Sequence, residues 1–277
     1  MSHSHSIFSE NTKAALQRII DEWSSFADID KFKAYELAVK SIAYYSADPD
    51  IRSQLRMFQD IENHWYKSLE TGEPDYNVYD HPYILSDLWA CWVKYSRNYL
   101  TLMLNEKRGP QDDYRNIVDH IGNIESVVDL GCGFGYTTAG LKEIFPSATV
   151  YGTNFPDGIQ FVLASHFGEK YGFSVVDSVQ TIGDHIDLVF ASEYFEHIPN
   201  AVEHVEDVIN VCTPRVILYA NTFTSKSIGH FPTYRYGDNL YDGRETSRMF
   251  GQSLKKLGYK QIKTRCWNNR PAYWRKD

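Results

Sequence analysis

Two short stretches of this chain carry residue types whose spacing suits chemistry. Residues 129–135 (DLGCGFG) place an acid two residues before the first of three alternating glycines. Residues 192–197 (SEYFEH) bring a hydroxyl, two carboxylates and an imidazole together within six positions. The first pattern is typical of a loop that receives a ligand. The second offers groups that can bind a ligand or move a proton.

The elements around the glycine loop indicate how it is held. Val127 and Val128 begin a short apolar run of the kind that a buried strand needs, and Asp129 ends it. The chain becomes amphipathic and helical from about Tyr136. A strand, a glycine loop and a helix form the front half of a βαβ unit. Glycines let the backbone turn sharply and let a ligand approach, because no Cβ stands in the way.

The spacing of the glycines separates two kinds of ligand. A dinucleotide loop has the pattern G-x-G-x-x-G and receives a pyrophosphate at the helix N-terminus. Here the third glycine comes one residue earlier, and the preceding acid suits an ammonium group better than a phosphate. Asp-x-Gly-x-Gly-x-Gly resembles the first motif of the class I S-adenosylmethionine-dependent methyltransferases. A nucleotide-binding domain and a glycine turn without a ligand are the alternatives.

The pattern after Val127 alternates between strands and helices, which favours a mostly parallel sheet. Further strands are expected at 148–153, 173–176, 186–191, 216–220 and 258–264, with a last short one in the tail. Helices are expected at 157–169, 200–212 and 244–257. This order is similar to the seven-stranded, Rossmann-like α/β sheet of the methyltransferases, and the resemblance covers about residues 125–265.

The first part of the chain reads differently. Apolar residues recur at helical spacing over 12–27, 30–46 and 50–69, and another helix is expected to begin at Asp80-His81-Pro82. We therefore expect an N-terminal α-helical cap over residues 1–110 and a cofactor-binding domain over residues 111–277. The cap would shape the acceptor pocket, with Trp92 among its lining residues.

The resemblance implies a set of residues around S-adenosylmethionine at the carboxyl ends of the strands. Asn154 stands where family members usually have an acid that binds both ribose hydroxyls. An amide keeps one acceptor oxygen but adds a donor, so Asn154 is either a weaker ribose contact or a turn residue. The implied cofactor-binding residues are Asp129, Gly131, Cys132, Gly133, Gly135, Asn154, Asp177, Ser192 and Glu193.

The segment 193–199 resembles the Glu-x-x-Glu-His-x-Pro segment of the small-molecule branch, which includes ubiquinone-pathway O-methyltransferases. It makes His197 the candidate general base, since an imidazole titrates near neutrality. The alternative is that His197 only holds the loop. The long stretch 224–243 is expected to be an irregular acceptor-side lid. Tyr194, Tyr234 and Tyr236 are expected to contact the acceptor together with Trp92. The segment is not H-E-x-x-H, so we expect no metal.

Composition limits the partners. The net charge of −8 and the isoelectric point of about 5.7 make duplex nucleic acid an unfavoured partner. Residues 251–277 nevertheless hold eight basic residues with Trp267, Tyr273 and Trp274 between them, a pattern that can bind single strands. Four scattered cysteines without a CxxC pair and the lack of a signal pattern or membrane span predict a cytoplasmic protein.

These observations predict S-adenosylmethionine-dependent methyl transfer to an oxygen or nitrogen of a small molecule. The alternatives are a methyltransferase that acts on nucleotides or nucleic acid, and a cofactor-binding protein of the same fold that transfers nothing.

Overall fold

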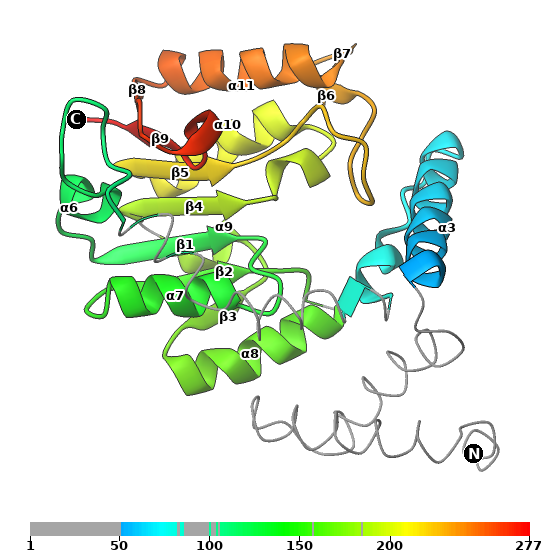
Figure 1. The fold of residues 1–277 in the computed structure, drawn as a ribbon, viewed down its shortest axis with the longest axis horizontal. Coiled ribbons are helices and arrows are strands. Elements are labelled where there is room, and N and C mark those ends of the chain that lie inside the picture. The colour runs from blue at the N-terminus through cyan, green and yellow to red at the C-terminus, as the bar shows by residue number, and fades with distance from the viewer. Residues whose placement is uncertain are drawn as a thin grey trace.

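The computed structural model describes residues 51–81, 84, 85, 100, 104, 106–156, 158–183 and 185–277. A seven-stranded sheet with the order β3-β2-β1-β4-β5-β9-β8 forms its centre (Figure 1). Strands β1 to β5 are parallel, and β9 runs antiparallel to both β5 and β8. The strands are β1 (Ser126–Leu130), β2 (Thr149–Thr153), β3 (Ser174–Val176), β4 (Leu188–Ser192), β5 (Val216–Ala220), β8 (Lys260–Ile262) and β9 (Ala272–Arg275). The predicted Rossmann-like α/β sheet is confirmed.

Both faces of the sheet are covered by helices, which explains why the central strands are continuous apolar runs. Val127 belongs to the core on one face and Val128 to the core on the other, because successive strand residues point to opposite sides. In Figure 1, α7 and α8 lie on one side of the sheet, and α10 and α11 on the other. The helices of this region are α6 (Ile117–Ile121), α7 (Tyr136–Ile144), α8 (Ile159–Tyr171), α9 (Val179–Ile182), α10 (Ala201–Cys212) and α11 (Gly243–Lys256).

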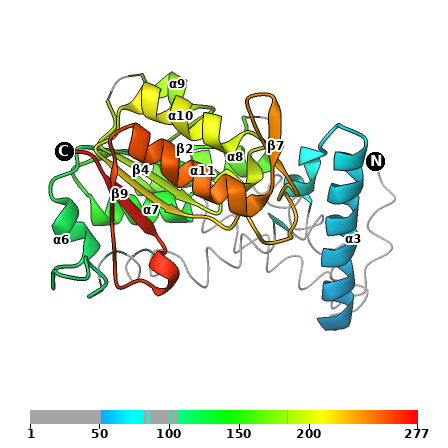
Figure 2. The same ribbon diagram turned by 90° about the horizontal axis from the view of Figure 1, so that it is seen from above.

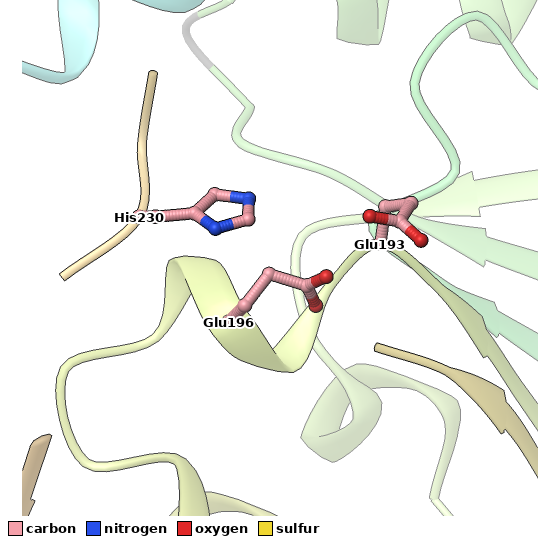
Figure 3. A group of neighbouring side chains, drawn as sticks. All are labelled: Glu193, Glu196 and His230. Carbon is pink, nitrogen blue, oxygen red and sulfur yellow. The ribbon is translucent and has the colours of Figure 1, made fainter. Parts of the chain in front are cut away.

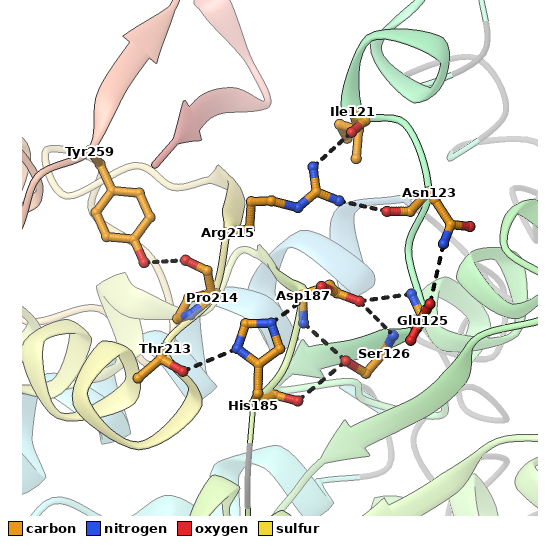
Figure 4. A network of polar contacts seen from close by, with 10 residues as sticks. All are labelled: Ile121, Asn123, Glu125, Ser126, His185, Asp187, Thr213, Pro214, Arg215 and Tyr259. Atoms are coloured by element: carbon orange, nitrogen blue, oxygen red, sulfur yellow. Dashed lines mark hydrogen bonds and ion pairs between the residues drawn. The ribbon is translucent and has the colours of Figure 1, made fainter. Parts of the chain in front are cut away.

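A polar network ties the amino-terminal ends of the central strands together (Figure 4). The Asp187 carboxylate accepts from the backbone N–H groups of Glu125 at 2.8 Å and Ser126 at 3.2 Å, and Ser126 Oγ accepts from Asp187 N at 3.0 Å. The Arg215 guanidinium donates to the carbonyl oxygens of Ile121 at 2.9 Å and Asn123 at 2.5 Å. These bonds fix β1 against β4 at the edge opposite the glycine loop, so the loop rests on a rigid base.

Residues 51–81 lie beyond the carboxyl ends of the strands, whereas Leu85, Leu100 and Leu104 pack into the core on one face of the sheet. Helix α3 (Ile51–Glu70) stands across that end, and the short helix η2 (Tyr76–Asp80) leads back toward the sheet (Figures 1 and 2). The Trp65 indole N–H donates to the backbone oxygen of His230 at 2.8 Å, and its ring packs edge-on against Phe231. α3 therefore contacts the chain that follows β5. The helices expected at 12–27 and 30–46, and Trp92, lie outside the described residues.

One expectation about the C-terminal part needs correction. The stretch 224–243 is not irregular throughout, because β6 (Tyr234–Tyr236) and β7 (Asn239–Tyr241) pair as an antiparallel hairpin around Gly237. In the tail, Tyr273 and Trp274 are buried, at 0% and 2% exposed, because β9 lies between β5 and β8 inside the sheet. These two rings cannot stack on the bases of a nucleic acid. None of the described helices is both long and apolar enough to cross a bilayer.

Candidate active site

The glycine loop turns as sharply as its three glycines predict. Gly131, Gly133 and Gly135 all have positive φ, at 65°, 56° and 83°, which side chains rarely adopt. The loop is fastened to the end of β2 because the Gly131 N–H donates to Thr153 Oγ1 at 3.1 Å and Cys132 N donates to Thr153 O at 2.9 Å. A Cβ on Gly131 would come within 2.4 Å of the Tyr194 ring. The Tyr194 ring thus covers the backbone of Gly131 at the start of the loop.

Asp129 is almost completely buried behind this loop. Its Oδ2 accepts from the hydroxyls of Thr137 at 2.6 Å and Thr138 at 2.7 Å, both in the first turn of α7. No described residue donates to Oδ1. Burial raises the pKa of Asp129 to about 6, although both hydroxyl bonds act in the opposite direction. Asp129 therefore orders the loop against α7, and one of its oxygens keeps its capacity to accept.

Asn154 connects the loop to the end of β2. Its side-chain nitrogen donates to Gly133 O at 2.9 Å, and its side-chain oxygen accepts from Phe155 N at 2.8 Å. The next side chain, Phe155, is 58% exposed, and both residues line a cavity of about 180 Å³ that η2 closes on the far side. Tyr79, at the end of η2, accepts from the Gln160 amide through its backbone oxygen at 2.9 Å.

The other implied cofactor residues are spread along the same edge. Asp177 follows β3, is exposed, and accepts from Thr181 Oγ1 at 2.5 Å, a bond that holds the pKa of Asp177 below its usual range. Ser192 ends β4. The Cys132 side chain packs into the interior against Gly152, so only the backbone of Cys132 faces the loop surface. This set fits an elongated ligand that carries an adenosine. The glycine backbone, the Asn154 oxygen and the exposed Phe155 ring lie one after another along the carboxyl edge of the sheet.

The segment after β4 turns sharply. Glu193 has a φ of +51°, a region that glycine favours, and its N–H donates to Ala220 O at 2.7 Å. The Tyr194 ring lies over Gly131, and its hydroxyl is 2.9 Å from His204 Nε2 on α10. Tyr194 thus stands between the glycine loop and α10, with its hydroxyl already partnered.

Three side chains converge beside this turn (Figure 3). Ligand atoms of Glu193, Glu196 and His230 all lie within 4.8 Å of one another. Glu196 belongs to η4 (Phe195–His197), and His230 comes from the chain between β5 and β6. The Glu196 side chain is fully buried and His230 is 5% exposed. Burial, and then the charge of Glu193, raise the pKa of Glu196.

His197 faces a different neighbour. Its Nδ1 lies 2.8 Å from the Tyr79 hydroxyl, and burial together with His230 lowers the pKa of His197 to about 3. A Cβ on Gly229 would come within 2.4 Å of His197 Nδ1 and 2.1 Å of the Tyr79 hydroxyl, so only glycine lets the backbone pass there. At neutral pH this imidazole is uncharged and weakly basic, which favours the loop-holding alternative for His197.

Tyr234 and Tyr236, two of the predicted acceptor contacts, each have a hydrogen-bond partner within the protein. Tyr234 is 1% exposed and its hydroxyl donates to the backbone oxygen of Glu196 at 3.0 Å, so it supports the cluster from behind. The Tyr236 hydroxyl donates to Glu206 of α10 at 3.4 Å. Trp92 lies outside the described residues. Sequence reasoning did not single out Tyr79 or Phe155, and the signal for Phe155 was its position directly after Asn154 at a strand end.

Comparison with known proteins gives the following. Residues 128–220 match the family model described as a methyltransferase domain. No curated protein matches the chain. Among solved structures, it is similar to a putative O-methyltransferase from Nostoc punctiforme (12% identity, 85% of this chain and 71% of that chain, TM-score 0.49). It is also similar to magnesium protoporphyrin IX methyltransferase from Synechocystis, solved with bound S-adenosylmethionine (12%, 81% and 97%, TM-score 0.40). A third, the StiE O-methyltransferase segment, shares 16% identity over 50% of this chain, with a TM-score of 0.37. The chain covers 47% of that segment's length.

Proposed function

We propose that this chain, which contains a class I S-adenosylmethionine-dependent methyltransferase domain, methylates an oxygen atom of a small molecule. The observation that carries the choice of oxygen is the cluster of Glu193, Glu196 and His230 beside the glycine loop. A hydroxyl must lose a proton when it is methylated, and these are groups that can receive one. A neutral amine does not need that help before it attacks.

The residues that would hold the cofactor lie along the carboxyl edge of the sheet. When bound there, S-adenosylmethionine supplies a methyl group that its sulfonium makes electrophilic. The backbone of Gly131 and Gly133 would lie against the aminoacyl part, with Oδ1 of Asp129 behind it, and the Tyr194 ring that covers Gly131 would have to turn aside. Asn154 and Phe155 would lie beside the ribose and adenine, next to the cavity that they line. Asp177 would contact the adenine amino group from the end of β3.

The main task of the protein is positioning, because the methyl donor is already reactive. Glu193 and Glu196 follow β4, the strand next to β1 in the sheet, so they would face an acceptor bound beside the glycine loop. Burial raises the pKa of Glu196 to about 8, so its deprotonated form, which grows as pH rises toward that value, accepts a proton more strongly than an ordinary carboxylate. Tyr79 and His197 would hold the chain around Gly229 in place and so position His230.

A transfer assay tests this function. The full chain is incubated with S-adenosylmethionine labelled in its methyl group and with matched pairs of phenols and anilines. We expect label in the phenol ethers, and we expect Glu196→Gln to lower turnover about 100-fold or more while S-adenosylhomocysteine still binds. Label only on the anilines would contradict the choice of oxygen, and no label with any acceptor would support a protein that only binds the cofactor.

A further inference from the structure

A second cavity, which we call the outer cavity, lies between α3 and the start of α11. Its volume is about 540 Å³, and pockets that hold small molecules have volumes of roughly 300–1,000 Å³. The chain between β5 and β6 passes between these two helices and supplies part of the lining (Figures 1 and 2). None of the described residues that line the outer cavity belongs to the glycine loop.

The walls of the outer cavity include three aromatic rings. Tyr66 comes from α3, and Phe223 and Phe231 come from the chain after β5. The Tyr66 hydroxyl donates to Ser227 O at 3.3 Å, and the Phe231 ring packs edge-on against Trp65 with 5.5 Å between their centroids. Because these contacts already order the rings, a planar ring of a ligand could pack against them at little further cost in entropy.

The charged side chains of the outer cavity are mainly cationic. Lys226 and Arg244 line it, both are exposed, and neither forms an ion pair within the part of the chain that the structure describes. Lys226 Nζ lies 4.6 Å from the centroid of the Tyr66 ring. The lining also holds one acid, Asp242, whose Oδ1 accepts from the N–H groups of Arg244 at 2.8 Å and Glu245 at 2.9 Å.

This arrangement favours an anionic ligand. The Asp242 carboxylate is engaged by the backbone at the start of α11, whereas the two cations have no carboxylate partner there. In a chain with a net charge of −8, two unpaired cations beside aromatic walls form a local exception. A carboxylate or a phosphate is the group that such cations bind best.

The outer cavity is separate from the cluster of Glu193, Glu196 and His230. Ser225 lines the cavity, and its carbonyl oxygen and Oγ lie 2.9 Å and 3.2 Å from His230 Nδ1. No member of the cluster lines the cavity itself. A ligand in the outer cavity would therefore contact Ser225 and would not reach the two carboxylates.

We propose that the outer cavity binds a second small molecule, one that carries a carboxylate or a phosphate on an aromatic ring. The ring would lie against Tyr66 and Phe231, and the anionic group would lie near Lys226 and Arg244. Binding of this molecule does not depend on the proposed function.

Calorimetric titration of the full chain with three naphthalene compounds tests the site. The probes are 2-naphthoate, 2-naphthyl phosphate and the uncharged 2-naphthylmethanol. We expect one site per chain for at least one of the anions, with about tenfold higher affinity than for the alcohol. The affinity should fall as salt is added, because the cations are exposed. The tighter of the two anions identifies the group that the cavity prefers.

Matched variants place the bound probe. Lys226→Gln and Arg244→Gln should each weaken binding of the anion about fivefold, and Thr224→Trp should block the cavity. Lys67→Gln on α3 and Lys255→Gln near the far end of α11 remove the same charge from residues that do not line the cavity, so they should bind as the wild type does. All five positions are exposed, and thermal melting shows that each variant folds.

The proposal would be overturned if neither anion bound, if the alcohol bound as tightly as the anions, or if Lys226→Gln and Arg244→Gln kept the wild-type affinity. Saturation with S-adenosylhomocysteine should leave the affinity for the anion unchanged, and competition between the two would place the probe in the cofactor site instead. Binding of S-adenosylhomocysteine without binding of the anions refutes only the outer site. Binding of the anion without binding of S-adenosylhomocysteine refutes only the proposed function.

Discussion

The side-chain nitrogen of Asn154 donates to the carbonyl oxygen of Gly133 at 2.9 Å, so the end of β2 holds the centre of the glycine loop. A carboxylate in this position could not make that bond. Class I methyltransferases usually have an acid at this position, and the asparagine found here makes a hydrogen bond within the chain that the acid could not make. Asn154 serves the loop, and its oxygen still has capacity for a ribose hydroxyl.

Replacement of Asn154 by Asp tests this relationship. The new carboxylate would face the Gly133 oxygen without a hydrogen between them, so we expect S-adenosylhomocysteine to bind about tenfold more weakly, a loss of roughly 1.4 kcal/mol. Calorimetric titration measures it. Tighter binding by the variant would show that contact with the ribose outweighs the support of the loop.

Gly133→Val should abolish measurable S-adenosylhomocysteine binding, because a branched side chain at a φ of +56° strains the loop and covers its surface. Gly122→Val is the matched control, since Gly122 also has a positive φ, at 79°, but follows α6 at the opposite edge of the sheet. Both variants should lose about 1–3 kcal/mol of stability. Only the first should lose the ligand, and equal ligand affinity in both would contradict the placement of the site.

Asp129 makes stability depend on pH. Its pKa is about 6 in the folded protein, against 3.8 as the ordinary value, so between these values the folded chain binds more protons than the unfolded one. The free energy of unfolding must therefore fall as pH rises from about 4 to 6. Asp129→Asn removes this titration while it keeps an oxygen for Thr137 and Thr138. Urea unfolding at several pH values should show wild type losing stability relative to the variant over that window, and parallel curves would count against the raised pKa.

His197→Asn should retain turnover within about tenfold, because an imidazole with a pKa of about 3 is a poor base at neutral pH. His197→Ala should instead lower the melting temperature, since it removes the partner of the Tyr79 hydroxyl. Tyr79→Phe should destabilise in the same way. A loss of about 100-fold in kcat for His197→Asn at unchanged stability would restore His197 as the general base.

The predictable part of this fold is the part with strong local signals. β5 has the predicted bounds, and β1 to β4 end within a residue or so of the predicted positions, because buried parallel strands are short apolar runs between polar turns. The hairpin of β6 and β7 was not predicted, because each strand has only three residues and so shows no clear alternation of apolar and polar side chains. The meeting of Glu196 with His230 could not be predicted either, because 33 residues separate them and a loop path determines it.

The binding of S-adenosylhomocysteine to the wild-type chain, measured by calorimetry beside NAD⁺ at the same concentrations, tests the central claim most directly. The account predicts one site for S-adenosylhomocysteine, competed by S-adenosylmethionine, and no heat from NAD⁺. Saturable binding of NAD⁺ would contradict it. So would a failure to bind both S-adenosylhomocysteine and S-adenosylmethionine.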